Sequence, residues 1–139
     1  MKLAAIIARI LLGAIFCFAG VCGIVFANNP PPAPNALSAE VQDALMRSHW
    51  MLFVSAIQII AGILLIANRY VPLGLTLLGA VLYNILAFHL TIMPAGLPPA
   101  LVVTFLYIVV LWPYRRRFAA FFVQEPDRGG ALASERVPG

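Results

Sequence analysis

The residues that could do chemistry in this chain are a few polar side chains placed inside long apolar runs. Arg9 lies about two turns into the first run, and Gln58 lies midway along the second. Asn84 lies near the middle of the third run, His89 is near the end of that run, and His49 opens the second. Unpaired polar groups are costly in hydrocarbon, so each of these side chains is expected to have a partner or a function.

Acidic residues are missing from most of the chain. Between Asp43 and Glu125 the sequence holds no aspartate or glutamate. Buried carboxylates are the usual proton carriers inside membranes, so this absence argues against proton-coupled chemistry. The sequence also has no phosphate-cradling glycine loop and no zinc-ligand spacing. These observations favour a binding or structural role over independent catalysis, and no catalytic residue is assigned.

The two histidines raise the question of a haem or a metal. His49 and His89 are expected at similar depth on neighbouring helices, as a pair of b-type haem ligands would be. Haem ligands usually sit deeper in the membrane, and His49 is next to Trp50 at the expected interface. A single hydrogen bond from His89 to a carbonyl or a quinone oxygen is the favoured interpretation. No metal site is predicted.

Arg9 belongs to a helix face of small residues. Gly13, Cys17 and Gly20 follow it at intervals of three or four residues, and small residues let membrane helices approach closely. Arg9 either snorkels to the head groups or faces the bundle, where it would hold a lipid phosphate, a quinone oxygen or a partner's carboxylate. Cys17 and Cys22 are five residues apart and point in different directions, so both are interpreted as packing residues.

The amides Gln58 and Asn84 are predicted to meet. Gln58 shares a helix face with Ser55 and Gly62. Asn84 belongs to the next apolar run, and consecutive spans joined by a tight turn pack side by side in opposite directions. A structural hydrogen bond between the two amides near mid-bilayer is the favoured interpretation. The alternative is an amide pair that lines a ligand cavity.

The composition predicts an all-α integral membrane protein. The chain has 139 residues, of which 63% are hydrophobic and 10% are charged. Soluble domains have about 45–50% apolar and about 25% charged residues. A helix needs about 20 apolar residues to cross a bilayer, and four runs come close enough to form an antiparallel four-transmembrane-helix bundle. The expected spans are residues 3–27, 49–67, 71–93 and 97–114.

The remaining segments are an outer loop and a tail. The loop covers residues 28–48, and its prolines stop the first helix because proline removes a hydrogen-bond donor. A short polar helix is expected inside it from Ser38 to Met46, with Ser38 as the N-cap. Residues 1–122 then form one membrane domain, and the polar tail at 123–139 is expected to be disordered on the cytoplasmic side.

Positive charges predict the orientation. One expected side collects most cations of the short loops and ends, namely Lys2, Arg69, Arg115, Arg116 and Arg117. The other side offers Arg47, which is close to Glu40 and Asp43. The positive-inside rule therefore places both termini in the cytoplasm, with the chain in a bacterial inner membrane. Basic residues at this position meet anionic lipid head groups, and no nucleic-acid partner is predicted.

Five segments together show a family pattern: residues 9–13 (RILLG), 57–62 (IQIIAG), 68–73 (NRYVPL), 84–89 (NILAFH) and 94–97 (PAGL). The pattern covers about residues 5–122 and resembles the DoxX family of small four-helix membrane proteins. The polar positions Arg9, Asn84 and His89 carry most of this resemblance. It implies association with redox membranes, because the family is linked to a quinol oxidase and a thiosulfate:quinone oxidoreductase.

Two functions follow from the resemblance. The family often has a glutamate where this chain has Gln58, and an amide cannot exchange a proton at physiological pH. The favoured function is therefore a non-catalytic accessory or structural subunit of a respiratory or photosynthetic electron-transfer complex, packed against other subunits or itself. The alternative is a quinone- or quinol-binding oxidoreductase component with its site near His89 and Asn84. Bound quinone or lipid would contact Arg9, Gln58, Asn84 or His89. Transport is disfavoured, because the spans lack paired charges and broken-helix repeats.

Overall fold

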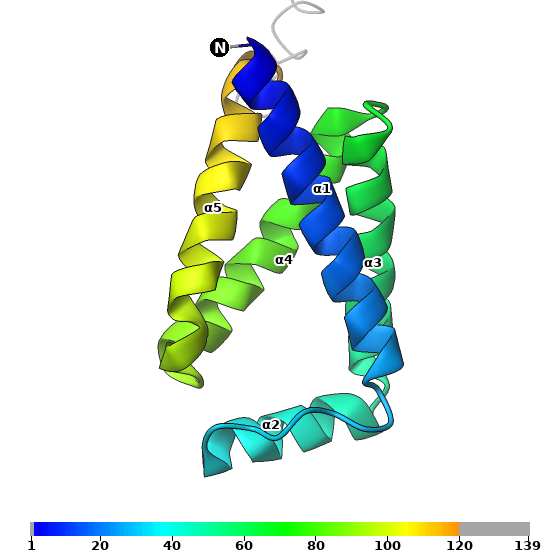
Figure 1. Cartoon of the computed structure of the whole chain (residues 1–139), viewed down its shortest axis with the longest axis vertical. Helices are drawn as coiled ribbons and strands as arrows, with labels where there is room; N and C mark the ends of the chain where they lie inside the picture. The colour runs from blue at the N-terminus through cyan, green and yellow to red at the C-terminus, as the bar shows by residue number, and fades with distance from the viewer. Residues whose placement is uncertain (1, 120–139) are drawn as a thin grey trace, which may run out of the picture.

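The computed structural model describes residues 2–119, which form α-helices joined by short turns (Figure 1). The helices are α1 (Lys2–Val25), α2 (Ala36–Arg47), α3 (Trp50–Ile66), α4 (Val71–Thr91), α5 (Leu97–Leu111) and α6 (Arg115–Ala119). Short 3₁₀ turns precede α5 at Pro94–Gly96 and follow it at Trp112–Tyr114. The all-α prediction is confirmed for the described residues. The tail predicted at 123–139 lies outside them.

Within the described part of the chain, three segments are long and apolar enough to cross a membrane: Leu3–Val25, Val71–Thr91 and Pro94–Ala119. The fourth candidate, α3, has 17 residues and is about 25 Å long at 1.5 Å per residue. It follows α2 at a bend of 82°. A hydrocarbon core is about 30 Å thick, so α3 alone falls slightly short. The described residues thus contain three to four apolar helices that could cross a membrane, which is compatible with the predicted multi-pass membrane protein.

The helices are arranged as a bundle with one helix lying across its end (Figure 1). Helix α3 packs along α1, α4 crosses behind α1, and α5 contacts both α1 and α4. Helix α2 lies across one end of the bundle, which we call the loop end. The start of α1, the α3–α4 turn and the end of α5 lie at the opposite end, which we call the basic end.

The core lies where these helices meet. Its fully buried large side chains come from α1, α3, α4 and α5: Leu12, Phe16, Leu65, Leu75, Leu78 and Val110. On α4 the buried positions recur at helical spacing, at residues 71, 74, 75, 78, 81 and 82, so one stripe of the helix faces its neighbours. Most other large apolar side chains are exposed, as expected where lipid tails cover them.

Glycines bring α1 and α3 into backbone contact, as the small-residue face of α1 predicts. A Cβ atom added to Gly62 would lie 2.7 Å from the carbonyl oxygen of Gly13 and 2.5 Å from Sγ of Cys17. A Cβ added to Gly20 would lie 2.8 Å from the carbonyl oxygen of Ser55. Only residues without a side chain allow two helices to approach so closely.

Helix α2 begins at an asparagine rather than at the predicted serine. Asn35 has extended backbone angles (φ −150°, ψ 164°), and its side chain accepts a hydrogen bond of 2.7 Å from the Ser38 N–H. The Ser38 hydroxyl accepts one in return from the Asn35 N–H, so the two residues form a capping box. Ser38 as N-cap is therefore wrong. Asn35 also donates to the Ile92 carbonyl at 3.1 Å and so ties the loop to the end of α4.

Candidate functional site

Arg9 faces the bundle, as one of its two interpretations predicts. Its guanidinium Nη1 donates a 3.0 Å hydrogen bond to the carbonyl oxygen of Leu65, and the residue is only 9% exposed. Leu65 belongs to the last turn of α3, where the helix dipole favours a cation, and its carbonyl also accepts a 3.2 Å hydrogen bond from the Asn68 N–H of the following turn. Arg9 thus caps α3 from α1. The described acidic residues, Glu40 and Asp43, both lie on α2 at the loop end.

Ser55 and Gln58 form a buried polar pair on α3 that faces α1. Ser55 is fully buried and Gln58 is 7% exposed. The Gln58 Cβ lies 3.3 Å from the position that a Cβ on Gly20 would occupy, and the Ser55 hydroxyl lies against Gly23. Among the described residues, the Ser55 Oγ is the buried side-chain polar atom without a hydrogen-bond partner. The shared face of Ser55, Gln58 and Gly62 is confirmed, because all three are buried.

Replacing Ser55 by alanine is expected to raise the free energy of unfolding by about 1 kcal/mol, because an unsatisfied buried hydroxyl costs about 1–3 kcal/mol. Unfolding by sodium dodecyl sulfate in mixed micelles, followed by far-ultraviolet circular dichroism, measures the change. Ser38→Ala is the matched control and should lower stability by about 1 kcal/mol, since it removes half of the α2 capping box. A loss of stability in Ser55→Ala would show that the hydroxyl has a partner.

Asn84 points away from Gln58, so the predicted amide pair does not form. Its Nδ2 donates a 2.8 Å hydrogen bond to the Ala80 carbonyl on its own helix, and its side chain is exposed. The reason is the packing of α4, whose buried stripe is apolar and leaves Asn84 about 120° away from it at 100° per residue. The neighbouring Tyr83 is 73% exposed. We define the α4 outer face by its exposed members Leu73, Thr76, Ala80, Tyr83, Asn84, Leu90 and Thr91.

His89 packs inside the turn that leads from α4 to α5. Its Nδ1 lies 2.8 Å from the Ile85 carbonyl oxygen and donates to it, which in the neutral ring leaves Nε2 as an acceptor. The ring lies directly against Gly96, where an added Cβ would collide with it. His89 is half-buried there, whereas Asn84 is exposed, and neither residue lines the hollow at the loop end or the groove at the basic end.

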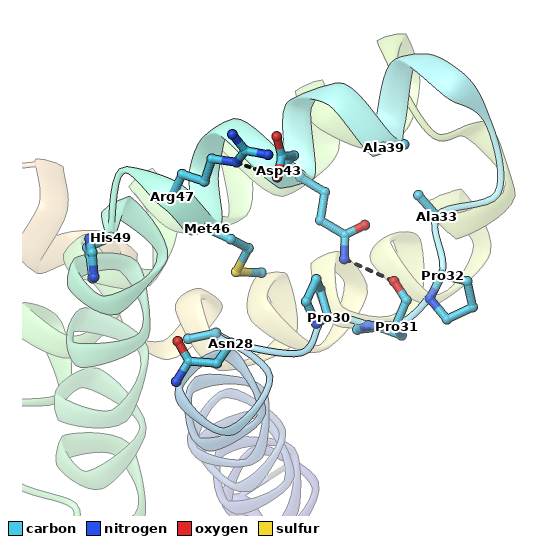
Figure 2. Close-up of a pocket in the computed structure, with 12 residues that line it drawn as sticks. Asn28, Pro30, Pro31, Pro32, Ala33, Ala39, Asp43, Met46, Arg47 and His49 are labelled. Atoms are coloured by element: carbon cyan, nitrogen blue, oxygen red, sulfur yellow. Dashed lines mark hydrogen bonds and ion pairs between the residues drawn. The ribbon is translucent and has the colours of Figure 1, made fainter.

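His49 stands apart from the other candidate residues, at the bend between α2 and α3. Its backbone is left-handed (φ 58°), and its side chain is exposed. It borders a hollow of about 510 Å³ between α2 and the proline-rich loop (Figure 2). In that hollow Gln42 donates to the Pro31 carbonyl at 3.0 Å, which joins the loop to α2, whereas the 2.8 Å pair of Arg47 with Asp43 lies within α2. The described residues contain no group of three or more potential metal ligands.

The sequence reasoning missed two tyrosines. Tyr107 on α5 donates a 2.9 Å hydrogen bond to the Leu75 carbonyl and so joins α5 to α4. Tyr83 is the most exposed aromatic residue of α4, near the middle of the span. Tyrosines in membrane proteins are concentrated at the two interfaces, so a tyrosine at mid-span is itself a signal that could have identified both residues.

Comparisons of the chain with family models, with curated proteins and with solved structures give no match, so they do not identify a family for it.

Proposed function

We propose that this chain is a non-catalytic accessory subunit that packs against a larger redox complex of the bacterial cytoplasmic membrane, with the α4 outer face as its docking surface. The observation that carries the proposal is the exposure of Tyr83 and Asn84 near the middle of an apolar helix. The redox character of the partner rests on the DoxX resemblance. The docking itself rests on the cost of leaving polar groups in lipid.

The depth of the two side chains makes that cost large. Residue 81 is the middle of the 21-residue helix Val71–Thr91, so Tyr83 and Asn84 lie only about 3–5 Å from the bilayer centre along the axis. The nearer edge of the hydrocarbon is then about 10 Å away, beyond the reach of either side chain. The Asn84 amide donates one hydrogen bond to Ala80, and both Asn84 and Tyr83 are exposed. Polar groups at this depth are normally covered by another helix.

The other outward faces differ from that of α4. The exposed side chains of α5 are apolar over its whole length, namely Leu101, Val102, Phe105 and Ile108. On α1 the large exposed residues are likewise aliphatic or aromatic hydrocarbon. Lipid tails satisfy such faces, so they require no protein partner. The contrast favours α4 as the side on which a neighbouring subunit packs.

A four-span topology with both termini in the cytoplasm completes the proposal. Helix α3 is short, but it runs back along α1, and the Arg9–Leu65 hydrogen bond joins its end to the start of α1. That path favours α3 as the second crossing. The basic end collects Arg69 and the arginines at 115–117, whereas the two described acidic residues lie at the loop end. Cations concentrate on the cytoplasmic side of membrane proteins, so the basic end is placed there.

Purification of the tagged chain from its native membrane in a mild detergent tests the proposal. Mass spectrometry of co-purifying proteins should find the subunits of one larger membrane complex in stoichiometric amounts. Extraction of lipids and quinones from the same sample tests the alternative function. Recovery of the chain alone with bound quinone would replace the subunit proposal by a quinone-binding one, centred on His89. Recovery of the chain alone without quinone would contradict both.

A further inference from the structure

The basic end of the bundle carries a groove where two separated segments of the chain meet. It has a volume of about 600 Å³ and is lined by Asn68, Tyr70, Val71, Pro72, Leu73, Tyr114 and Arg117. These residues come from the α3–α4 turn, the first residues of α4 and the corner between α5 and α6. We propose that this groove binds the phosphate of an anionic phospholipid head group. This site adjoins the docking surface proposed for α4, with which it shares Leu73, but the inference does not rest on that docking.

The charge around the groove is positive and has no acidic counterpart among the described residues. Arg117 lines the groove, and its guanidinium stacks over the Tyr114 ring at 5.6 Å from the centroid. Arg115 stacks over Trp112 at 4.7 Å and also donates to the Trp112 carbonyl. The ion pair found in the described region, Arg47–Asp43, lies at the loop end. A phosphate would therefore meet arginine without competition from a nearby described carboxylate.

Uncharged donors line the opposite wall. Helix α4 begins at this wall, and its N-cap residue Tyr70 makes no side-chain cap, so the N–H groups of Val71 and Leu73 keep their donor capacity, whereas Pro72 has no N–H. The helix dipole adds a partial positive charge at the same place. Asn68 and the phenols of Tyr70 and Tyr114 add side-chain donors. Arginine, amide, phenol and helix N-terminus are all groups that bind phosphate oxygens.

The position of the groove favours a lipid over a soluble phosphate compound. It lies where α4 begins and α5 has just ended, which is the level of the membrane interface for both helices. Trp112 and Tyr70 are exposed there, as aromatic residues of an interfacial belt are. The part of the groove formed by the start of α4 is apolar and consists of Val71, Pro72 and Leu73. Leu73 is 54% exposed and belongs to the α4 outer face. An acyl chain can follow this apolar surface while its phosphate stays in the groove.

Native mass spectrometry of the delipidated full-length protein tests the inference. Short-chain phosphatidylglycerol is titrated against phosphatidylcholine of the same chain length, and inorganic phosphate is a third arm. The anionic lipid should bind at least about fivefold more tightly than the zwitterionic one, and salt at about 0.5 M should weaken that preference. Equal binding of the two lipids would overturn the proposal. Equal competition by inorganic phosphate would replace the lipid by a soluble phosphate compound.

Arg117→Gln should weaken binding of the anionic lipid by about tenfold, since it removes a charge-assisted hydrogen bond to the phosphate. The control is Arg47→Gln, which removes another exposed arginine, at the loop end, and should leave binding unchanged. Unaltered binding in Arg117→Gln, or an equal loss in both variants, would place the lipid elsewhere. The comparison of the two lipids on the wild-type chain decides the matter even where a variant folds poorly.

Discussion

Replacing Gly62 by leucine is expected to lower the free energy of unfolding by about 3 kcal/mol or to prevent folding, because it forces α1 and α3 apart. A Cβ alone at this position would lie 2.7 Å from the Gly13 carbonyl oxygen, which is backbone and cannot rotate away. The same interface holds the Arg9–Leu65 hydrogen bond and a 3.7 Å contact from Cys17 Sγ to the Ile59 carbonyl. Separation of the helices would break both.

Unfolding in mixed micelles with increasing sodium dodecyl sulfate measures this effect. Ala56→Leu is the matched control, because it adds a leucine at an exposed position of the same helix and should change stability by less than about 0.5 kcal/mol. Gly62→Ala should fall between the two, since it introduces the clash without the larger side chain. If Gly62→Leu were as stable as Ala56→Leu, the close α1–α3 packing would be contradicted.

Combining Tyr83→Phe with Asn84→Leu is expected to reduce recovery of the partner complex by about tenfold while the subunit itself remains folded. Polar contacts between membrane helices average about 0.6 kcal/mol and reach about 1.7 kcal/mol, so two contacts account for a tenfold change in affinity. Neither side chain belongs to the core, and the one hydrogen bond removed, from Asn84 to Ala80, lies within α4 on an exposed surface. Stability should therefore stay within about 0.5 kcal/mol of the wild type.

Quantitative mass spectrometry of the purified tagged variants measures the recovery as the molar ratio of partner subunits to the tagged chain. The matched control is a double variant on the exposed face of α5, Leu101→Ala with Phe105→Leu, for which recovery should be unchanged. Full recovery in the α4 variant would remove the basis of the docking proposal. Loss of recovery in the α5 variant alone would move the docking surface to α5.

Features that depend on local sequence were predictable. Apolar length alone identifies helices that can cross a membrane, and the prolines at 30–32 mark where α1 has ended, because proline cannot continue a hydrogen-bonded helix. The sequence also predicts which face of α1 contacts another helix. Gly13, Cys17 and Gly20 recur at helical spacing, and a row of small residues marks a close helix contact independently of its partner.

The direction in which each polar side chain points was decided by the tertiary structure. In water, an apolar stripe shows which face of a helix is buried, but in a bilayer the lipid side and the core side are equally apolar. Thr76, Tyr83 and Asn84 share one side of α4, but a polar side can equally face a neighbouring helix, as Gln58 faces α1, so the sequence does not show that Asn84 faces outward. Arg9 likewise finds its acceptor, Leu65, 56 residues away along the chain, through a contact that exists only once α3 has packed back along α1.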